Sequence, residues 1–190
     1  AGNDTEYQRM SISSEIDEAT LREAYLLPFE EAVAAGVRVV MSAYNRLNGT
    51  FCGEHPWLLT TVLRDEWGFD GFVVSDWGSI GEMVSHGYVE NLEQAARVAV
   101  LAGSDMDMES RAYVAHLAGL VRSGAVEAKL VDDAVRRVLR VKFRLGLFDD
   151  PYRYADEERE KTTLYKPEFL EAARDVARKS IVLLKNEGDV

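Results

Sequence analysis

The stretch that decides the fold runs from Val37 to Asp76 and reads VRVVMSAYNRLNGTFCGEHPWLLTTVLRDEWGFDGFVVSD. It opens with an apolar run, VRVVMSA (37–43), and closes with a second one, GFVVSD (71–76). A third run, SDMDM (104–108), follows, so the starts of the three runs lie 34 and 33 residues apart. Short apolar runs at such intervals are typical of buried parallel strands joined by helices. The stretch therefore predicts a βα repeat.

Helical patterns fill the intervals between these runs. The clearest begins at Pro56, which suits the first turn of a helix, and stops at Gly68. Upstream, residues 19–36 are helical in pattern, but Pro28 predicts a break within them because proline lacks the N–H that an internal turn needs. Three further helices are expected at 90–102, at 111–122 before Gly124, and at 128–145 before Gly146.

These elements predict an α/β fold with right-handed crossovers in a parallel sheet. A closed barrel of eight such units needs about 250 residues, so residues 1–148 are expected to form only part of a (β/α)8 TIM-type barrel. Residues 149–166 are polar and unpatterned, as an interdomain linker is. Residues 167–190 predict a helix followed by a strand at Ile181–Lys185, which is too little to form a core of its own.

Composition argues against several classes of partner. The formal charge of −11 comes from 33 acidic against 22 basic residues spread along the chain, which makes a nucleic acid a poor partner. No run of about eighteen apolar residues occurs, so no membrane span is expected. The lone Cys52 excludes an internal disulfide and is compatible with a reducing compartment such as the cytoplasm.

The sequence predicts neither a cofactor nor a metal. It contains no glycine-rich loop of the kind that cradles phosphates, which argues against a nucleotide cofactor. The three histidines, His55, His86 and His116, have no partner at metal-ligand spacing and no nucleophilic serine or cysteine motif beside them. We therefore assign them no function and expect chemistry based on carboxylates.

Asp76 is the leading catalytic candidate. In parallel βα folds the catalytic groups lie at the carboxyl ends of the strands, and Asp76 closes the run GFVVSD. Trp77 follows it and offers an aromatic face of the kind that stacks on sugar rings. The alternative is that Asp76 only caps a turn. Asp105 and Asp107 compete for the role, but their alternation with apolar residues favours a structural one.

Three residues at and just beyond the end of the preceding run could line the same cavity as Asp76, namely Met41, Tyr44 and Asn45. The Tyr44 hydroxyl could orient a nucleophilic carboxylate, and Met41 lies three residues before it. Each also has a purely structural interpretation, Tyr44 as a core residue with a satisfied hydroxyl and Met41 as a gap filler. Spacing alone leaves the two interpretations open.

Residues 40–80, VMSAYNRLNGTFCGEHPWLLTTVLRDEWGFDGFVVSDWGSI, resemble the region around the nucleophile in glycoside hydrolase family 3, in its β-glucosidase branch. Flanking stretches resemble the same family in the same order, namely ISSEIDEATLREAYLLPFEEAV, AGSDMDM and ARKSIVLLKNEG. The resemblance implies a retaining β-glucosidase that acts on terminal β-linked glucosides or oligosaccharides through a covalent glycosyl-Asp intermediate. By that resemblance Asp76 is the nucleophile, and Trp77, Tyr44 and Met41 contact the sugar.

The resemblance also implies an internal fragment that holds the later units of the barrel and the first elements of an α/β sandwich. The family's sugar-binding lysine–histidine pair would precede this chain, and its general acid/base would follow Val190. We therefore expect a complementary polypeptide to supply both. The alternatives are a β-xylosidase of the same family and a non-catalytic carbohydrate-binding or assembly fragment. Trp77 disfavours the family's N-acetylglucosaminidase branch, which usually has another residue there.

Overall fold

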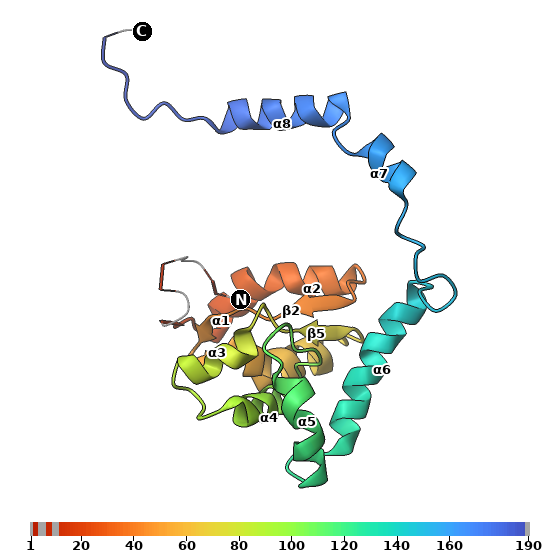
Figure 1. The fold of residues 1–190 in the computed structure, drawn as a ribbon. Helices are drawn as coiled ribbons and strands as arrows, with labels where there is room; N and C mark the ends of the chain where they lie inside the picture. The colour runs from red at the N-terminus through yellow and green to blue at the C-terminus, as the bar shows by residue number, and fades with distance from the viewer. Residues whose placement is uncertain (1, 4–6, 9–11, 189–190) are drawn as a thin grey trace. The chain divides into compact units, whose positions relative to one another are not determined.

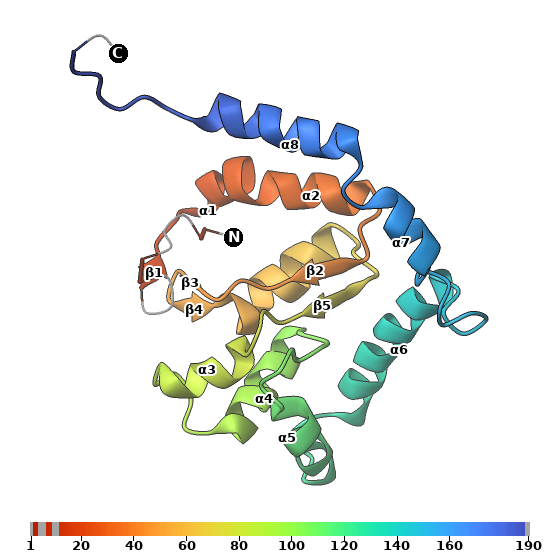
Figure 2. The ribbon, with the colours of Figure 1, turned by 45° about the horizontal axis from the view of Figure 1, so that its top comes forward.

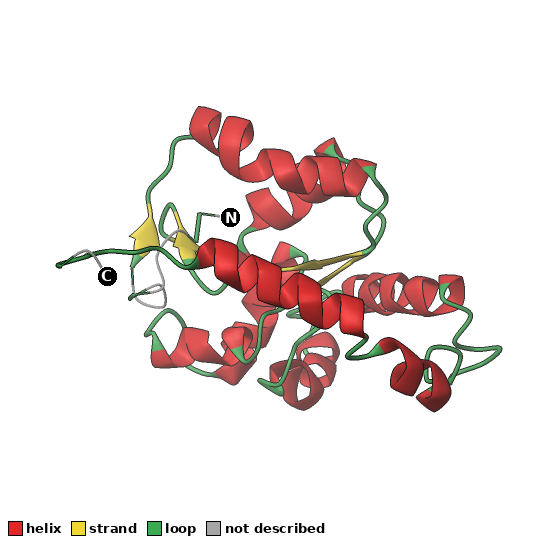
Figure 3. Cartoon of the chain, turned by 90° about the horizontal axis from the view of Figure 1, so that it is seen from above, coloured by secondary structure: helices red, strands yellow, loops and turns green. Residues whose placement is uncertain are grey.

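A computed structural model of the protein describes residues 2–3, 7–8 and 12–188. The chain divides into two compact units, residues 1–145 and 146–190, and each is described by itself below. Helices dominate, and the strands are few and short (Figure 3). The fold is therefore of a mixed α/β class.

The central sheet of the first unit has the predicted parallel pairing. Strand β2 (Val39–Met41) pairs with β5 (Phe72–Val74), and Val40 lies opposite Val73. Figures 1 and 2 show the two strands side by side, with α2 (Leu27–Ala34) on one side and α4 (Leu92–Ala102) on the other.

The prediction of a third strand at Ser104–Met108 is wrong. This segment contributes only a single parallel bridge, between Met106 and Val74. The bridge continues the sheet beyond β5, but no further strand pairing follows it in the described residues. The physical reason lies at Asp105, whose carboxylate accepts the Val73 N–H at 2.8 Å. A side chain takes the place of a backbone carbonyl there, and a regular ladder cannot form.

A second small sheet was not predicted. Strands β3 (Arg46–Leu47) and β4 (Thr50–Phe51) form a hairpin, and β1 (Ser13–Ser14) pairs in parallel with β3. The turn is Asn48–Gly49, with φ of 49° and 83°. Asn-Gly with both residues at positive φ is the preferred two-residue hairpin turn. The Asn-Gly pair in the sequence was therefore sufficient to predict the hairpin.

The expected break at Pro28 does not occur, because the helix is continuous from Glu18 to Ala34. It passes from α1 (Glu18–Thr20) through a π-helical segment, η1 (Leu21–Leu26), into α2. Pro28 stands in the first turn of α2 directly after the wide π turns. A change of hydrogen-bond register next to proline accommodates its missing N–H without ending the helix.

The other predicted helices of this unit are confirmed, and two short ones are added. Helix η3 (Trp57–Glu66), also of π type, begins after Pro56, and Gly68 beyond it has φ of 67°. Three helices match the expectations, α4 (Leu92–Ala102), α5 (Ala112–Arg122) and α6 (Ala128–Arg144). The additions are η2 (Cys52–Glu54), a 3-10 turn, and α3 (Ser79–Ser85), which directly follows the Asp76 loop.

Two buried apolar clusters hold this unit together. The first joins η1 and η3 to the sheet and includes Leu21, Val62 and Val73, each at most 2% exposed. The second lies where α4 packs against α3 and α5, and small alanines on α4 permit their close approach. The first cluster holds β5, which leads to Asp76, through Val73, and the second holds α3, which follows Asp76, through Ile80 and Met83.

Gly71, at the start of the strand that leads to Asp76, should tolerate no side chain. A Cβ there would lie 2.1 Å from the Arg38 carbonyl oxygen, which is backbone and cannot rotate away. Gly71→Ala is therefore expected to destabilise the chain by about 1–3 kcal/mol, measured by urea unfolding. Gly119→Ala, in helix α5 with open space around the new methyl group, should instead stabilise it by about 0.5–1 kcal/mol. Equal effects of the two changes would contradict this account.

The second unit contains two helices, α7 (Glu157–Thr163) and α8 (Pro167–Ser180). Helix α7 lies within the stretch that was expected to be unpatterned, and the Asp156 carboxylate caps it by accepting the Arg159 N–H at 2.9 Å. The expected strand Ile181–Lys185 does not form, and Leu184 is 91% exposed. A strand needs a hydrogen-bonding neighbour, and no described residue pairs with this segment. None of the helices in the described residues is long and apolar enough to cross a membrane.

Candidate active site

The parallel pairing brings the ends of three segments of the first unit together. Asp76 lies two residues beyond β5, and Tyr44 lies three residues beyond β2. Backbone hydrogen bonds continue past both strands, from Ser42 N–H to the Val74 carbonyl and from Ser75 N–H to the Met106 carbonyl, each 2.9 Å long. The side chains that were predicted from strand ends therefore share one edge of the sheet.

Asp76 is half-buried on the loop between β5 and α3. Its Oδ1 accepts the N–H of Trp77 at 2.7 Å, and its carbonyl oxygen accepts the N–H of Ser79 at 3.1 Å. The first bond fixes the carboxyl group against its own backbone, and the second starts the turn into α3. A fixed carboxylate that solvent can reach is chemically suited to attack an electrophilic carbon.

Trp77 and Tyr44 meet beside this carboxylate. The indole of Trp77 is 62% exposed, as a surface for stacking must be. The Tyr44 hydroxyl donates a hydrogen bond to the Trp77 carbonyl oxygen, so it holds the backbone of the residue that follows Asp76. Tyr44 thus acts on the loop that carries the carboxylate, a contact that spacing alone did not specify.

Met41 faces another part of the surface. It is 51% exposed and lines an apolar hollow together with Leu26 and Phe29. Asp76 does not line that hollow, which carries no charged side chain. The contact of Met41 with a sugar remains a prediction.

Asp105 has the structural role that its pattern favoured. Its side chain is only 2% exposed and forms ion pairs with Arg64 from η3 and with Arg137 from α6, the latter at 2.7 Å. Burial lowers the pKa of the Arg64 guanidinium, whereas the charge of Asp105 acts in the opposite direction. Asp107 accepts hydrogen bonds from Ser110 Oγ and from the Tyr113 N–H, at 3.2 Å for the latter, and so holds the start of α5.

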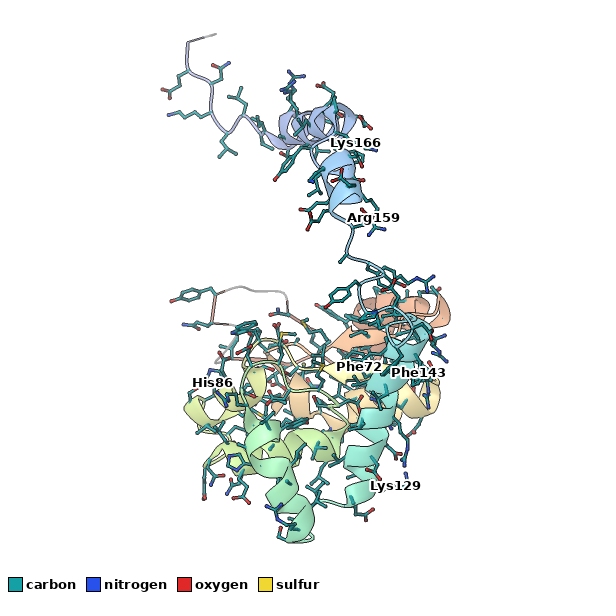
Figure 4. The ribbon with its side chains drawn as sticks, turned by 45° about the vertical axis from the view of Figure 1, so that its right-hand side comes forward. Phe72, His86, Lys129, Phe143, Arg159 and Lys166 are labelled. Atoms are coloured by element: carbon teal, nitrogen blue, oxygen red, sulfur yellow. The ribbon has the colours of Figure 1, made fainter. Side chains whose placement is uncertain are left out.

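A buried cluster that sequence reasoning missed joins the β3–β4 hairpin to the end of α3. Glu54 is 5% exposed, and its carboxyl group shares a hydrogen bond with the Tyr88 hydroxyl. The rings of Phe51 and His86 are stacked with their centroids 5.7 Å apart, and Arg46 lies over Phe51. Figure 4 shows His86 just beyond α3. The cluster fixes the chain beyond Tyr44 to the helix that follows Asp76.

Burial raises the pKa of the Glu54 carboxyl group to about 7, against an ordinary value of 4.5. At a pH between these two pKa values, Glu54 keeps its proton in the folded chain and has lost it in the unfolded chain. Folding stability therefore falls as the pH rises through this range. We expect the free energy of unfolding to drop by about 1–3 kcal/mol between about pH 5 and pH 8, measured by urea unfolding. Glu54→Gln should remove most of this slope. The control Glu66→Gln should keep it, because Arg22 lowers the pKa of the exposed Glu66.

No group of histidine, cysteine, aspartate or glutamate side chains within the described part of the chain is arranged to hold a metal ion. Cys52 is buried, and burial raises the pKa of its thiol, which disfavours the nucleophilic thiolate. The side chains that meet at this edge of the sheet are those of Asp76, Tyr44 and Trp77.

Known proteins include close sequence relatives of this chain. The chain is 43% identical to a periplasmic β-glucosidase of Salmonella typhimurium over 95% of its own length and 24% of the relative. It is 39% identical to a β-xylosidase of Formosa agariphila, covering 93% of this chain and 25% of that protein.

Among solved structures, a β-glucosidase of Listeria innocua in complex with glucose superposes with a TM-score of 0.79 at 35% identity, covering 94% of this chain and 24% of that one. The chain thus spans about a quarter of the length of these relatives. Residues 3–141 match the family model of the glycosyl hydrolase family 3 N-terminal domain. The chain therefore belongs to glycosyl hydrolase family 3.

Proposed function

We propose that the chain carries the nucleophile half of a retaining β-glucosidase, with Asp76 as the nucleophile. The observation that carries the proposal is the half-buried Asp76 carboxylate at the carboxyl end of β5, fixed by the Trp77 N–H beside the exposed Trp77 indole. A sugar ring on the indole would bring its anomeric carbon near the carboxylate. The β-glucosidase relatives and the structure with bound glucose support glucose as the sugar.

In this mechanism a carboxylate oxygen of Asp76 bonds to the anomeric carbon as the bond to the leaving oxygen breaks. A second carboxyl group, about 5–5.5 Å away, protonates that oxygen and later takes a proton from the water that releases the sugar. Neither Asp105 nor Asp107 suits this task, because both carboxylates are committed to structural hydrogen bonds. The proposal therefore assigns the acid/base to another part of the enzyme.

The rest of the enzyme would come from a complementary polypeptide. The central parallel sheet of the first unit has two paired strands extended by one bridge, whereas a (β/α)8 barrel closes with eight strands. We propose that residues 1–148 are the later units of such a barrel, that 149–166 link two domains, and that 167–190 begin an α/β sandwich. The exposed apolar residues of 181–184 fit a strand that gains its partner only in the assembly.

The test is the stereochemistry of hydrolysis. The chain, alone and combined with the complementary polypeptide, is incubated with 4-nitrophenyl β-D-glucoside while proton NMR follows the anomers of released glucose. Only the complete enzyme should hydrolyse the glucoside, and the β-anomer of glucose should be released first. Initial release of the α-anomer would contradict a covalent intermediate on Asp76. No turnover by a folded, complete assembly would favour the non-catalytic alternative.

A β-xylosidase is the second candidate because one relative bears that name. A xyloside differs from a glucoside by the missing hydroxymethyl group, whose loss changes binding by about 1–3 kcal/mol in a fitted pocket. Comparison of kcat/KM for the 4-nitrophenyl glucoside and xyloside decides between them. Equal or higher kcat/KM for the xyloside would replace glucose by xylose and leave the role of Asp76 intact.

A further inference from the structure

Ser75, the residue before Asp76, is fully buried at 0% exposure. Its hydroxyl donates a hydrogen bond of 3.0 Å to the carbonyl oxygen of Asp76. The Ser75 hydroxyl oxygen in turn accepts the N–H of Met108 at 2.8 Å. One hydroxyl therefore joins the backbone of the candidate nucleophile to the segment that continues the sheet.

Other hydrogen bonds hold the residues around Asp76 to the same two neighbouring segments. On the 104–108 side, Gly78 N–H donates to the Met108 carbonyl at 2.8 Å. On the β2 side, the Tyr44 hydroxyl donates to the Trp77 carbonyl. The backbone that follows Asp76 is thus fixed by both neighbours, whereas the carbonyl of Asp76 itself is linked to the 104–108 segment through the Ser75 hydroxyl.

The direction of a carboxylate on so short a side chain depends on its backbone. The Asp76 Oδ1 is bonded to the N–H of Trp77, the amide nitrogen of the peptide unit whose carbonyl oxygen accepts the Ser75 hydroxyl. Rotation of that peptide unit would therefore move the carboxylate with it. A displacement of about 1 Å at a reacting atom can cost on the order of 10²-fold in rate.

We propose that Ser75 is a positioning residue of the reaction, whose hydroxyl fixes the Asp76 peptide and through it the direction of the nucleophilic carboxylate. The proposal rests on the proposed function of Asp76. A purely structural serine would satisfy only the Met108 N–H and would affect stability without affecting the rate of attack on the sugar. The two roles predict different kinetics.

The experiment measures the attack step alone in the complete enzyme. The probe is 2,4-dinitrophenyl 2-deoxy-2-fluoro-β-D-glucoside, whose leaving group departs without protonation and so does not need the acid/base. Its dinitrophenolate release gives the rate constant of glycosylation and the binding constant separately. Ser75→Ala is expected to lower the rate constant by about ten- to a hundredfold, with the binding constant within about threefold of the wild type.

Ser104→Ala is the matched control. Ser104 is 1% exposed and begins the segment next to β5, but no described residue hydrogen-bonds its hydroxyl. The Ser104→Ala enzyme loses a buried hydroxyl oxygen, as Ser75→Ala does, but it should be glycosylated at the wild-type rate. Ser75→Thr, which keeps the hydroxyl, should recover most of the rate.

An unchanged rate constant in Ser75→Ala, or an equal fall in Ser104→Ala, would overturn the positioning role while Asp76 remained the nucleophile. No labelling of the wild-type enzyme would overturn the proposed function and the positioning role together. If Ser75→Ala does not fold, Ser75→Cys keeps the volume with a much weaker hydrogen-bond donor. Its glycosylation rate constant should fall as well, and an unchanged value would overturn the proposal.

Discussion

Asp76→Gly is expected to reduce turnover of 4-nitrophenyl β-D-glucoside by the complete enzyme by about 10⁴-fold or more, because it removes the atom that forms the covalent bond. The binding of glucose should change far less, since the stacking surface of Trp77 remains. The measurement is kcat together with the inhibition constant of glucose. The matched control is Asp107→Asn, a second acid near the same sheet edge, which should retain most of the activity.

Azide provides the decisive addition to this experiment. The small anion can occupy the space that the carboxylate leaves and attack the anomeric carbon from the same side. It should restore measurable turnover to Asp76→Gly and yield the α-glucosyl azide, with inverted configuration. Rescue of Asp107→Asn in place of Asp76→Gly, or formation of the β-azide, would show that the nucleophile has been assigned to the wrong residue.

The largest effect on stability is expected at Asp105. Asp105→Ala leaves Arg64 and Arg137 without their shared carboxylate and also removes the acceptor of the Val73 N–H. Breaking one side of such a buried ion pair costs about 3–5 kcal/mol, because a desolvated charge is left without compensation. Urea unfolding should show a loss of this size, and β5, which carries Asp76, should be among the elements that loosen.

Asp70→Ala is the control for this prediction. Asp70 also binds two arginines, Arg38 and Arg144, but its side chain is 39% exposed. Solvent screens such a pair, so its loss should cost about 1 kcal/mol or less. If the two variants lost equal stability, burial would not be the reason that Asp105 matters.

Much of the first unit could be predicted because its signals are local. Pro56 and Gly68 mark the ends of one helix, and the apolar runs around Val40 and Val73 mark the paired strands. The Asn48–Gly49 turn was an equally local signal that was overlooked. Asp76 could be chosen from sequence because strand ends in a parallel sheet share one edge, and the family resemblance then named its role.

Other features depended on contacts between residues far apart in the chain. The third run became a single bridge because Asp105 meets Arg64 and Arg137, which lie 41 and 32 residues away from it. The raised pKa of Glu54 follows from burial that no local pattern reveals.

The sequence by itself thus determined the main helices of the first unit, the pairing of β2 with β5, the membership of the family and the candidate nucleophile, because periodicity and motifs are properties of neighbouring residues. Only the tertiary structure decided that the Ser75 hydroxyl joins Asp76 to Met108 and that Tyr44 holds the Trp77 backbone. The physical reason is that hydrogen bonds and burial depend on distances in space, and these arise only when separate segments pack together.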